Sequence, residues 1–309
     1  MAKNRTLQRL RRRLVYWGAR AAQWLVLRLP FDAAIRLGGR LGRLAFAAMW
    51  RERRRTLEHL AMAFGNEKSE AERREIARGV FENAGRCAAE IMLAPHWTDE
   101  RLRERIRFAN PEPLLEAFRS GQGVVIMCGH LGNWELLGAY GSRIVGLNAG
   151  VIARRLSNPH LDRLINQYRR NAGLKVFLRG EPARGFFRHL TGGGTLAILA
   201  DQDVRRIDGT FVEFFGRPAH TATGPAELIL RSRANWFFAF LRRSKDGGSH
   251  ELYCKGPLPV FEGEDHAARV RRVTEEYVRQ MEEAIRLQPD LWMWMHNRWR
   301  RKPKREDEG

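Results

Sequence analysis

Cysteine is scarce in this chain, and long apolar runs are absent. Cys87, Cys128 and Cys254 are odd in number and widely spaced, which excludes a disulfide framework and a paired Cys-x-x-Cys zinc site. The best apolar run is interrupted by Arg20 and Arg28, so a polytopic transporter or channel is excluded and a conventional spanning helix is disfavoured. We therefore expect a folded protein from a reducing compartment.

Acidic residues are in deficit, most strongly at the start of the chain. The 309 residues carry a net charge of +20, and 15 Lys and Arg against Asp32 and Glu52 give residues 1–55 a net charge of +13. Aromatic side chains such as Trp17 and Trp24 are interleaved with this charge. Phosphodiesters and phospholipids both attract arginine, but the apolar content favours an anionic membrane over nucleic acid. Arginines break the apolar stretch and no Ala-x-Ala site follows, so we expect the segment to be retained rather than cleaved as a signal peptide.

The sequence pattern changes from helical to alternating near residue 121. Between residues 31 and 97, apolar residues at three- and four-residue spacing predict helices. After Gly121-Gln122-Gly123, short apolar runs alternate with helical patterns, which predicts β-α-β-α-β order and a parallel sheet. The predicted strands are 124–128, 149–153, 174–178, 195–200, 236–241 and 251–254, and the predicted helices are 159–171, 181–190 and 266–287.

No repeat, low-complexity stretch or Pro/Ser-rich linker divides the chain. We therefore assign residues 1–55 to a basic amphipathic membrane-associating segment and residues 56–120 to a helical segment packed on the body. Residues 121–309 form the α/β body, and 56–309 are treated as one folded unit. The expected fold class is a three-layer α/β/α body with a mostly parallel sheet, preceded by N-terminal membrane-associating helices.

The sharpest chemical signal is the stretch from Gly129 to Glu135, directly after the predicted strand 124–128. Ligands of open α/β sheets bind at the carboxyl ends of strands, which is where His130 falls. Residues five apart on one helix point about 140° away from each other. We therefore place His130 in the turn and Glu135 in the first turns of the following helix, where the two can converge as a general base and its carboxylate. The alternative is a capped helix start with a solvated Glu135.

Other polar residues admit more than one interpretation. Asp201 and Asp203 end a predicted strand on the same rim as His130, where they could support an active-site arginine, cap a turn or bind a divalent metal. The Cys128 thiol is a disfavoured nucleophile. His296, in a Trp-rich stretch, is suited equally to packing and to contact with an acceptor.

Five blocks occur in order along the chain. They are His130-x4-Glu135; Arg155, Asn158, Pro159, Leu161 and Asp162; Ala200 to Asp203; Phe214-Phe215-Gly216 with Ala219 to Ala226; and Pro289, Trp292, Trp294, His296 and Arg298 to Arg300. Together they resemble the late acyltransferases of lipid A biosynthesis, the lauroyl and myristoyl transferases, within the His-x4-Asp/Glu acyltransferases. Leu156, Asn297 and Arg300 depart from the residues usual in that family.

The resemblance implies transfer of an acyl group from a thioester, on acyl carrier protein or CoA, to a hydroxyl of a lipid A precursor. The reaction would occur at the cytoplasmic face of the bacterial inner membrane, with the protein held interfacially or by a single weak N-terminal anchor. His130 would deprotonate the acceptor hydroxyl, and Glu135 would orient and charge-balance His130. Backbone N–H groups after His130 would stabilise the oxyanion, and neither a metal nor a cofactor is required.

The resemblance further implies residues that support the substrate, the oxyanion or a phosphate. These are Arg155, Asn133, Asp201 and Arg169, with Arg170 as the alternative to Arg169 if the helix register is shifted. Three other functions stay open: acylation of another glycolipid or lysophospholipid, a metal-dependent membrane-associated glycosyltransferase using the Asp201-x-Asp203 pattern, and a nucleic-acid-binding protein. The last is disfavoured because the sequence has no helix-turn-helix or zinc pattern.

Overall fold

The computed structural model describes residues 2–204 and 207–303, with the side chains of residues 2–6 left out. Four helices come first along the chain: α1 (Ala2–Val26), α2 (Phe31–Ala48), α3 (Trp50–Phe64) and α4 (Glu70–Met92). Short helices α5 (Asp99–Arg105) and α6 (Glu112–Arg119) lead into the body. The boundary that we placed at residue 55 falls inside α3, which is one continuous helix.

A seven-stranded sheet with the order β1-β9-β8-β2-β5-β3-β4 forms the body. Its strands are β1 (Ile106–Arg107), β2 (Val124–Cys128), β3 (Ala149–Ala153), β4 (Lys175–Leu178), β5 (Thr195–Leu199), β8 (Asn235–Arg243) and β9 (His250–Lys255). The five strands from β8 to β4 are parallel, and β9 is antiparallel to β8. The predicted mostly parallel sheet is confirmed, with β2 at its centre.

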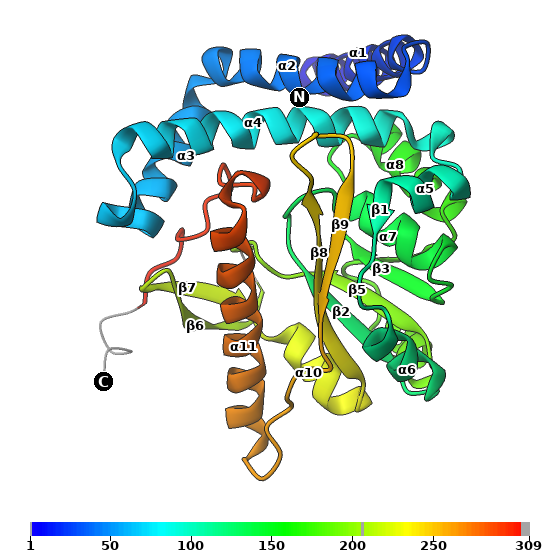
Figure 1. Cartoon of the computed structure of the whole chain (residues 1–309), viewed down its shortest axis with the longest axis vertical. Helices are drawn as coiled ribbons and strands as arrows, with labels where there is room; N and C mark the ends of the chain where they lie inside the picture. Colours follow the sequence, from blue (N-terminus) through cyan, green and yellow to red (C-terminus); the bar gives the residue numbers. More distant parts are fainter. Residues whose placement is uncertain (1, 205–206, 304–309) are drawn as a thin grey trace.

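Helices cover both faces of this sheet (Figure 1). They are α7 (Trp134–Arg143), α8 (Pro159–Asn171), α9 (Arg184–Thr191), α10 (Gly224–Ser232) and α11 (His266–Leu287). Alternate residues of β2 enter different cores: Val125 and Met127 pack with α11, and Val124 and Ile126 pack with α7. Burial on both faces explains why β2 is an unbroken apolar run.

A second sheet was not predicted from the sequence. Strands β6 (Gly209–Phe214) and β7 (Arg217–Ala222) pair as an antiparallel hairpin apart from the main sheet. Pro218 lies inside β7, and a proline within a short stretch of strand-forming residues argues against a central strand there. Strand β1 also escaped prediction, because two residues are too few to show a pattern.

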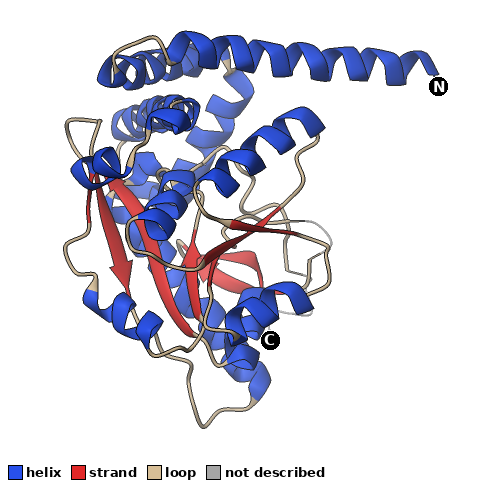
Figure 2. Cartoon of the chain, turned by 90° about the vertical axis from the view of Figure 1, so that its right-hand side faces the viewer, coloured by secondary structure: helices blue, strands red, loops and turns tan. Residues whose placement is uncertain are grey.

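The first helix carries apolar side chains that the rest of the chain does not cover. Figure 2 shows α1 extending away from the body toward its N-terminal end. Trp17 and Trp24 are 65% and 55% exposed, whereas the Gln23 amide donates to the Met92 carbonyl oxygen at 2.9 Å and ties the helix to α4. No helix among the described residues is long and apolar enough to cross a membrane. Association of this helix with a membrane surface stays a prediction.

Candidate active site

His130 lies in the turn after β2, at the carboxyl edge of the sheet. Asp201 follows the neighbouring strand β5, and its Oδ1 is 2.8 Å from Nδ1 of His130. The other carboxylate oxygen of Asp201 accepts hydrogen bonds from the His130 backbone N–H and from the Trp292 indole N–H, both at 2.9 Å. Three donors therefore fix this carboxylate, and the carboxylate in turn fixes the imidazole ring.

The electrostatics of the pair suit a proton acceptor. Burial alone would lower the pKa of His130, but the Asp201 carboxylate outweighs burial and the pKa is raised above its usual 6.5. Burial alone would raise the pKa of Asp201, but His130 and the other donors hold it at about 2. Because Nδ1 faces Asp201, Nε2 is the nitrogen left to accept a proton.

Glu135 does not make the contact that we expected. It lies in the first turn of α7, as predicted, but its carboxylate forms a bidentate ion pair with Arg169 of α8, with one Nε–Oε2 distance of 3.0 Å. Among the described residues, Glu135 has no hydrogen bond to His130, which is oriented by Asp201 instead. Glu135 still raises the pKa of His130 through space, as the smallest of the contributions. The expected orienting role of Glu135 is therefore wrong, and charge balance at longer range stays a prediction.

Arg169 is expected to support the substrate, the oxyanion or a phosphate, and in the structure its partners are protein side chains. Its guanidinium donates to both oxygens of Glu135 and, at 3.0 Å, to the side-chain oxygen of Asn166. All three guanidinium nitrogens of Arg169 thus donate to side-chain oxygens of the protein. The neighbouring Arg170, our alternative, is exposed.

Asn133, another candidate, caps α7 rather than facing the cavity around His130. Its side-chain oxygen accepts from the Leu136 N–H at 3.1 Å, and its amide donates to Glu90 of α4 at 2.9 Å. The preceding Gly132 has a φ of 62°, in the left-handed region that favours glycine. The hydrogen bond from Asn133 to Glu90, a residue 43 positions earlier in the chain, therefore anchors the end of the turn that carries His130 to α4.

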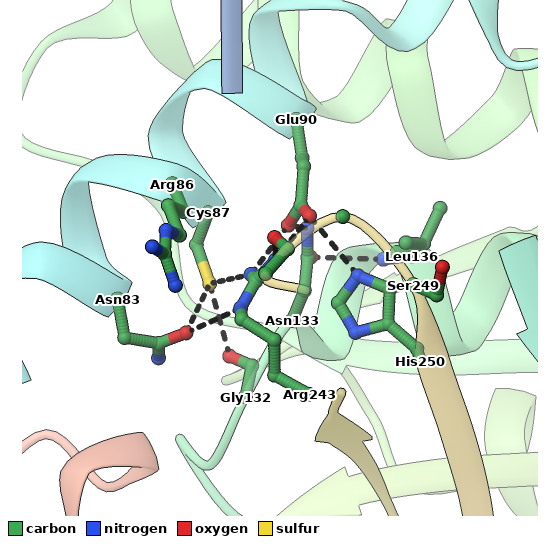
Figure 3. Close-up of polar contacts among 12 residues, drawn as sticks. Asn83, Arg86, Cys87, Glu90, Gly132, Asn133, Leu136, Arg243, Ser249 and His250 are labelled. Atoms are coloured by element: carbon green, nitrogen blue, oxygen red, sulfur yellow. Dashed lines mark hydrogen bonds and ion pairs between the residues drawn. The ribbon is translucent and has the colours of Figure 1, made fainter. Parts of the chain in front are cut away.

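Figure 3 shows the buried polar network to which Asn133 belongs. The Glu90 carboxylate accepts two hydrogen bonds from Arg243, at 2.6 and 2.8 Å, and one from His250 at 3.0 Å. The Cys87 thiol lies 3.6 Å from the Gly132 carbonyl oxygen. Burial works against ionisation, but Arg243 outweighs it and lowers the pKa of Glu90. This network was not predicted, because Glu90 is one of several glutamates in α4 and nothing in the sequence marks it as buried.

The two aspartates of the Asp-x-Asp block have different hydrogen-bond partners. Asp201 binds His130, whereas Asp203 accepts from the backbone N–H and the side-chain Nε of Arg301, at 2.9 and 2.7 Å. Both carboxylates are buried and engaged by protein donors. Within residues 2–204 and 207–303, no group of three or more His, Cys, Asp or Glu side chains could hold a metal ion.

A cavity of about 780 Å³ opens beside His130. Glu135 and Arg169 form part of its wall, and apolar side chains form most of the rest, among them Leu114, Ile126, Leu147, Val151, Leu174 and Leu252. The cavity runs between the sheet and helices α7 and α8, so an apolar chain that enters it would lie against buried carbon and end beside the imidazole.

The remaining candidates lie nearby with less definite geometry. Arg155 is exposed in the loop after β3, and its contact with a substrate stays a prediction. Cys128 is buried and burial raises the pKa of its thiol, which argues against a thiolate nucleophile. Burial also lowers the pKa of His296 to about 4, and its Nε2 is buried without a hydrogen-bond partner among the described residues.

Along nearly its whole length, the chain is similar to known bacterial acyltransferases. A family model described as bacterial lipid A biosynthesis acyltransferase matches residues 1–301. The lipid A biosynthesis lauroyltransferase of Escherichia coli K12 is 28% identical over 294 residues, which cover 93% of this chain and 92% of the relative. The palmitoleoyltransferase of the same organism is 24% identical over 291 residues, covering 93% and 91%. A phosphatidylinositol mannoside acyltransferase of Mycolicibacterium smegmatis is 26% identical over 299 residues, covering 88% and 95%.

Proposed function

The chain belongs to the bacterial lipid A biosynthesis acyltransferase family, and from that premise we propose that it transfers a fatty acyl chain from an acyl-thioester to a hydroxyl of a lipid A precursor. The observation that carries the proposal is the His130–Asp201 pair at one wall of an apolar cavity of about 780 Å³. A proton acceptor and a site for hydrocarbon are the two elements that acyl transfer to a lipid hydroxyl needs.

The reaction steps follow from the placement of His130. Nε2 takes the proton of the acceptor hydroxyl as its oxygen attacks the thioester carbonyl carbon. The Asp201 carboxylate stabilises the resulting imidazolium, because it accepts from Nδ1 at 2.8 Å. When the tetrahedral intermediate collapses, the carbon–sulfur bond breaks and the leaving thiolate takes the proton from His130. Backbone N–H groups in the first turn of α7 lack helical partners; that of Leu136 donates to the Asn133 side chain, and those of Trp134 and Glu135 can stabilise the oxyanion.

Glu135 has a different role in this proposal from that of a partner to His130. Its ion pair with Arg169 joins α7 to α8 across the cavity wall, and the side chains are 20% and 18% exposed. The pair fixes the positions of both side chains in the cavity wall, and the charges of Glu135 and Arg169 compensate each other there. Neither a metal nor a cofactor takes part in any of these steps.

The donor and the acceptor are the finer parts of the proposal. We favour acyl carrier protein over CoA as the acyl carrier, and a lipid A precursor over a phosphatidylinositol mannoside. The matched relatives include acyltransferases named for each of these two acceptors, so the family alone leaves the acceptor open.

The proposed location is the cytoplasmic face of the bacterial inner membrane, with the N-terminal helices at the lipid surface. Exposed apolar side chains of α1 support it, and α2 adds a second set, with Leu41 and Leu44 56% and 67% exposed. Arg36, Arg40 and Arg43 flank these leucines on the same helix. An apolar stripe beside arginines is suited to the boundary of an anionic bilayer.

The test is acyl transfer by the purified full chain in detergent micelles. Acyl carrier protein and CoA thioesters are each offered with a lipid A precursor, a phosphatidylinositol mannoside or a lysophospholipid, and the products are identified by mass spectrometry. Ester formation on the lipid A precursor, with acyl carrier protein as the better donor, is the expected result. Transfer only to another acceptor, or none to any, would overturn the proposal.

A further inference from the structure

We propose that Arg154 and Arg179 form a binding site for a phosphate group of a substrate. The site stands at the rim of the cavity that holds His130, and the inference rests on the proposed acyl transfer. Phosphate is present in both candidate substrates, in the headgroup of a phosphorylated glycolipid acceptor and in the phosphopantetheine arm of the donor.

The sheet brings the two arginines together. Strands β3 and β4 are parallel and in register, with Ala153 paired to Leu178. Arg154 and Arg179 directly follow this pair, and the Arg179 N–H donates to the Ala153 carbonyl oxygen at 2.8 Å. Both residues therefore leave the carboxyl edge of the sheet side by side, at the edge where α/β proteins bind their ligands.

The two guanidinium groups lack acidic partners among the residues that the structure describes. Neither guanidinium forms an ion pair or a side-chain hydrogen bond with any of the residues that the structure describes, whereas Arg169 in the same cavity is engaged by Glu135. Burial, and then the charge of Arg154, lower the pKa of Arg179, so the two groups are close enough to repel each other. An anion bound between them would relieve that repulsion, and arginine forks match phosphate oxygens in shape.

The distance from His130 suits a group that is attached to the reacting substrate but does not itself react. The strand order β2-β5-β3-β4 puts Arg154 two strands and Arg179 three strands from the strand that carries His130. At about 4.8 Å per strand, these separations are roughly 10 and 14 Å. Arg154, Arg179 and His130 all line the same cavity, so one substrate can reach both ends.

The experiment compares Arg154→Gln/Arg179→Gln with the wild type and with Arg188→Gln. Arg188 is an exposed arginine of α9 outside the cavity lining, so its loss changes the net charge without touching the site. In one arm, kcat/KM is measured for a phosphorylated acceptor and the same lipid after phosphatase treatment. In the other, it is measured for acyl-phosphopantetheine and acyl-pantetheine.

For the substrate whose phosphate is bound, removal of the phosphate should lower the wild-type kcat/KM by about 10- to 100-fold. The double variant should show the same loss with the phosphate present and no further loss without it, while Arg188→Gln behaves as the wild type. The arm in which this happens identifies the source of the phosphate. Wild-type values in the double variant for both phosphorylated substrates, or undiminished discrimination, would overturn the site.

A second measurement separates this inference from the proposed function. If the wild type transfers no acyl group to any acceptor, acyl transfer itself is wrong, and the site is then judged by thermal stabilisation with inorganic pyrophosphate. The expected result is a smaller rise in Tm for the double variant than for the wild type and Arg188→Gln. Equal rises in all three would reject the site regardless of activity.

Discussion

Replacing Asp201 with Asn tests the central contact of the active site. In the wild type, one oxygen of Asp201 accepts from two donors, the His130 backbone N–H and the Trp292 indole, and the other accepts from Nδ1 of His130. An asparagine has a single side-chain oxygen, which would accept from the His130 backbone N–H and the Trp292 indole N–H. Its NH₂ group would then face Nδ1 and force the ring proton onto Nε2, the nitrogen that must accept the substrate proton.

The magnitude has an electrostatic and a tautomeric part. The pKa of Asp201 is about 2, against 3.8 for an unperturbed carboxyl, which corresponds to about 2–3 kcal/mol of net interaction or a factor of roughly 60. The wrong tautomer adds to this loss, and the comparable change in serine proteases costs about 10⁴-fold in kcat. We therefore expect Asp201→Asn to lower kcat by about 10³–10⁴-fold in an acyl-transfer assay that follows thiol release.

The pH dependence has a defined sign. The pKa of His130 is raised above 6.5 in the wild type, so activity should fall on the acid side at a pH above that value. Without the carboxylate, burial is left to act and the acid limb of the residual activity should move to lower pH. The stability that Asp201 contributes is present above about pH 4 and is lost as the pH falls toward 2, since its folded pKa is depressed.

Asp203→Asn is the matched control. Asp203 is equally buried on the same loop but binds Arg301, so this variant should lose stability without a shift of the acid limb. If Asp201→Asn retained a kcat within tenfold of the wild type, or kept the wild-type acid limb, the assignment of Asp201 as the partner of the base would be refuted.

Four further outcomes are expected. His130→Ala should lower kcat by about 10²–10⁴-fold with an unchanged circular dichroism spectrum, and near-normal turnover would exclude a histidine base. Glu90→Gln leaves Arg243 buried without its carboxylate, so the free energy of unfolding in urea should fall by about 3–5 kcal/mol, and an unchanged value would contradict a structural ion pair. Deleting residues 1–30 should weaken co-sedimentation with anionic vesicles and leave the remainder to Leu41 and Leu44 of α2, and about 1 M NaCl should weaken it without abolishing it; release by salt alone would mean purely electrostatic attachment. Excess EDTA should leave acyl transfer unchanged. A loss of activity that Mg²⁺ or Mn²⁺ restores would instead indicate that Asp201 and Asp203 bind a metal ion.

The strands of the main sheet were predictable because burial on both faces leaves a mark in the sequence. β2, β3 and β5 are short apolar runs, and the helices between them keep a helical spacing. The hairpin of β6 and β7 lies outside this sheet and has mixed polarity, so neither a continuous run nor a clean alternation marks it. The local sequence pattern was thus sufficient to predict the strands of the main sheet. It was insufficient to predict the hairpin, whose strands depend on tertiary packing.

The partner of His130 shows the same limit at the level of single residues. Glu135 is five positions away in the sequence, whereas Asp201 is 71 positions away and becomes a neighbour only because β5 pairs with β2. The sequence pattern predicts that His130 and Asp201 lie at strand ends on one edge of the sheet, but strand order decides which ends are adjacent. Since strand order depends on packing of the whole domain, the contact could not be derived from spacing.

The His-x4-Glu spacing nevertheless has a physical reason in this fold. It sets His130 in the turn and Glu135 in the first turn of α7, so the two side chains line one cavity without touching. Each is then held by its own partner, Asp201 or Arg169, from a different part of the chain. Because Glu135 is already paired, the charge that His130 gains on accepting a proton is balanced by Asp201 alone at contact distance. The motif therefore fixes where the two groups stand, and residues outside it determine what each of them does.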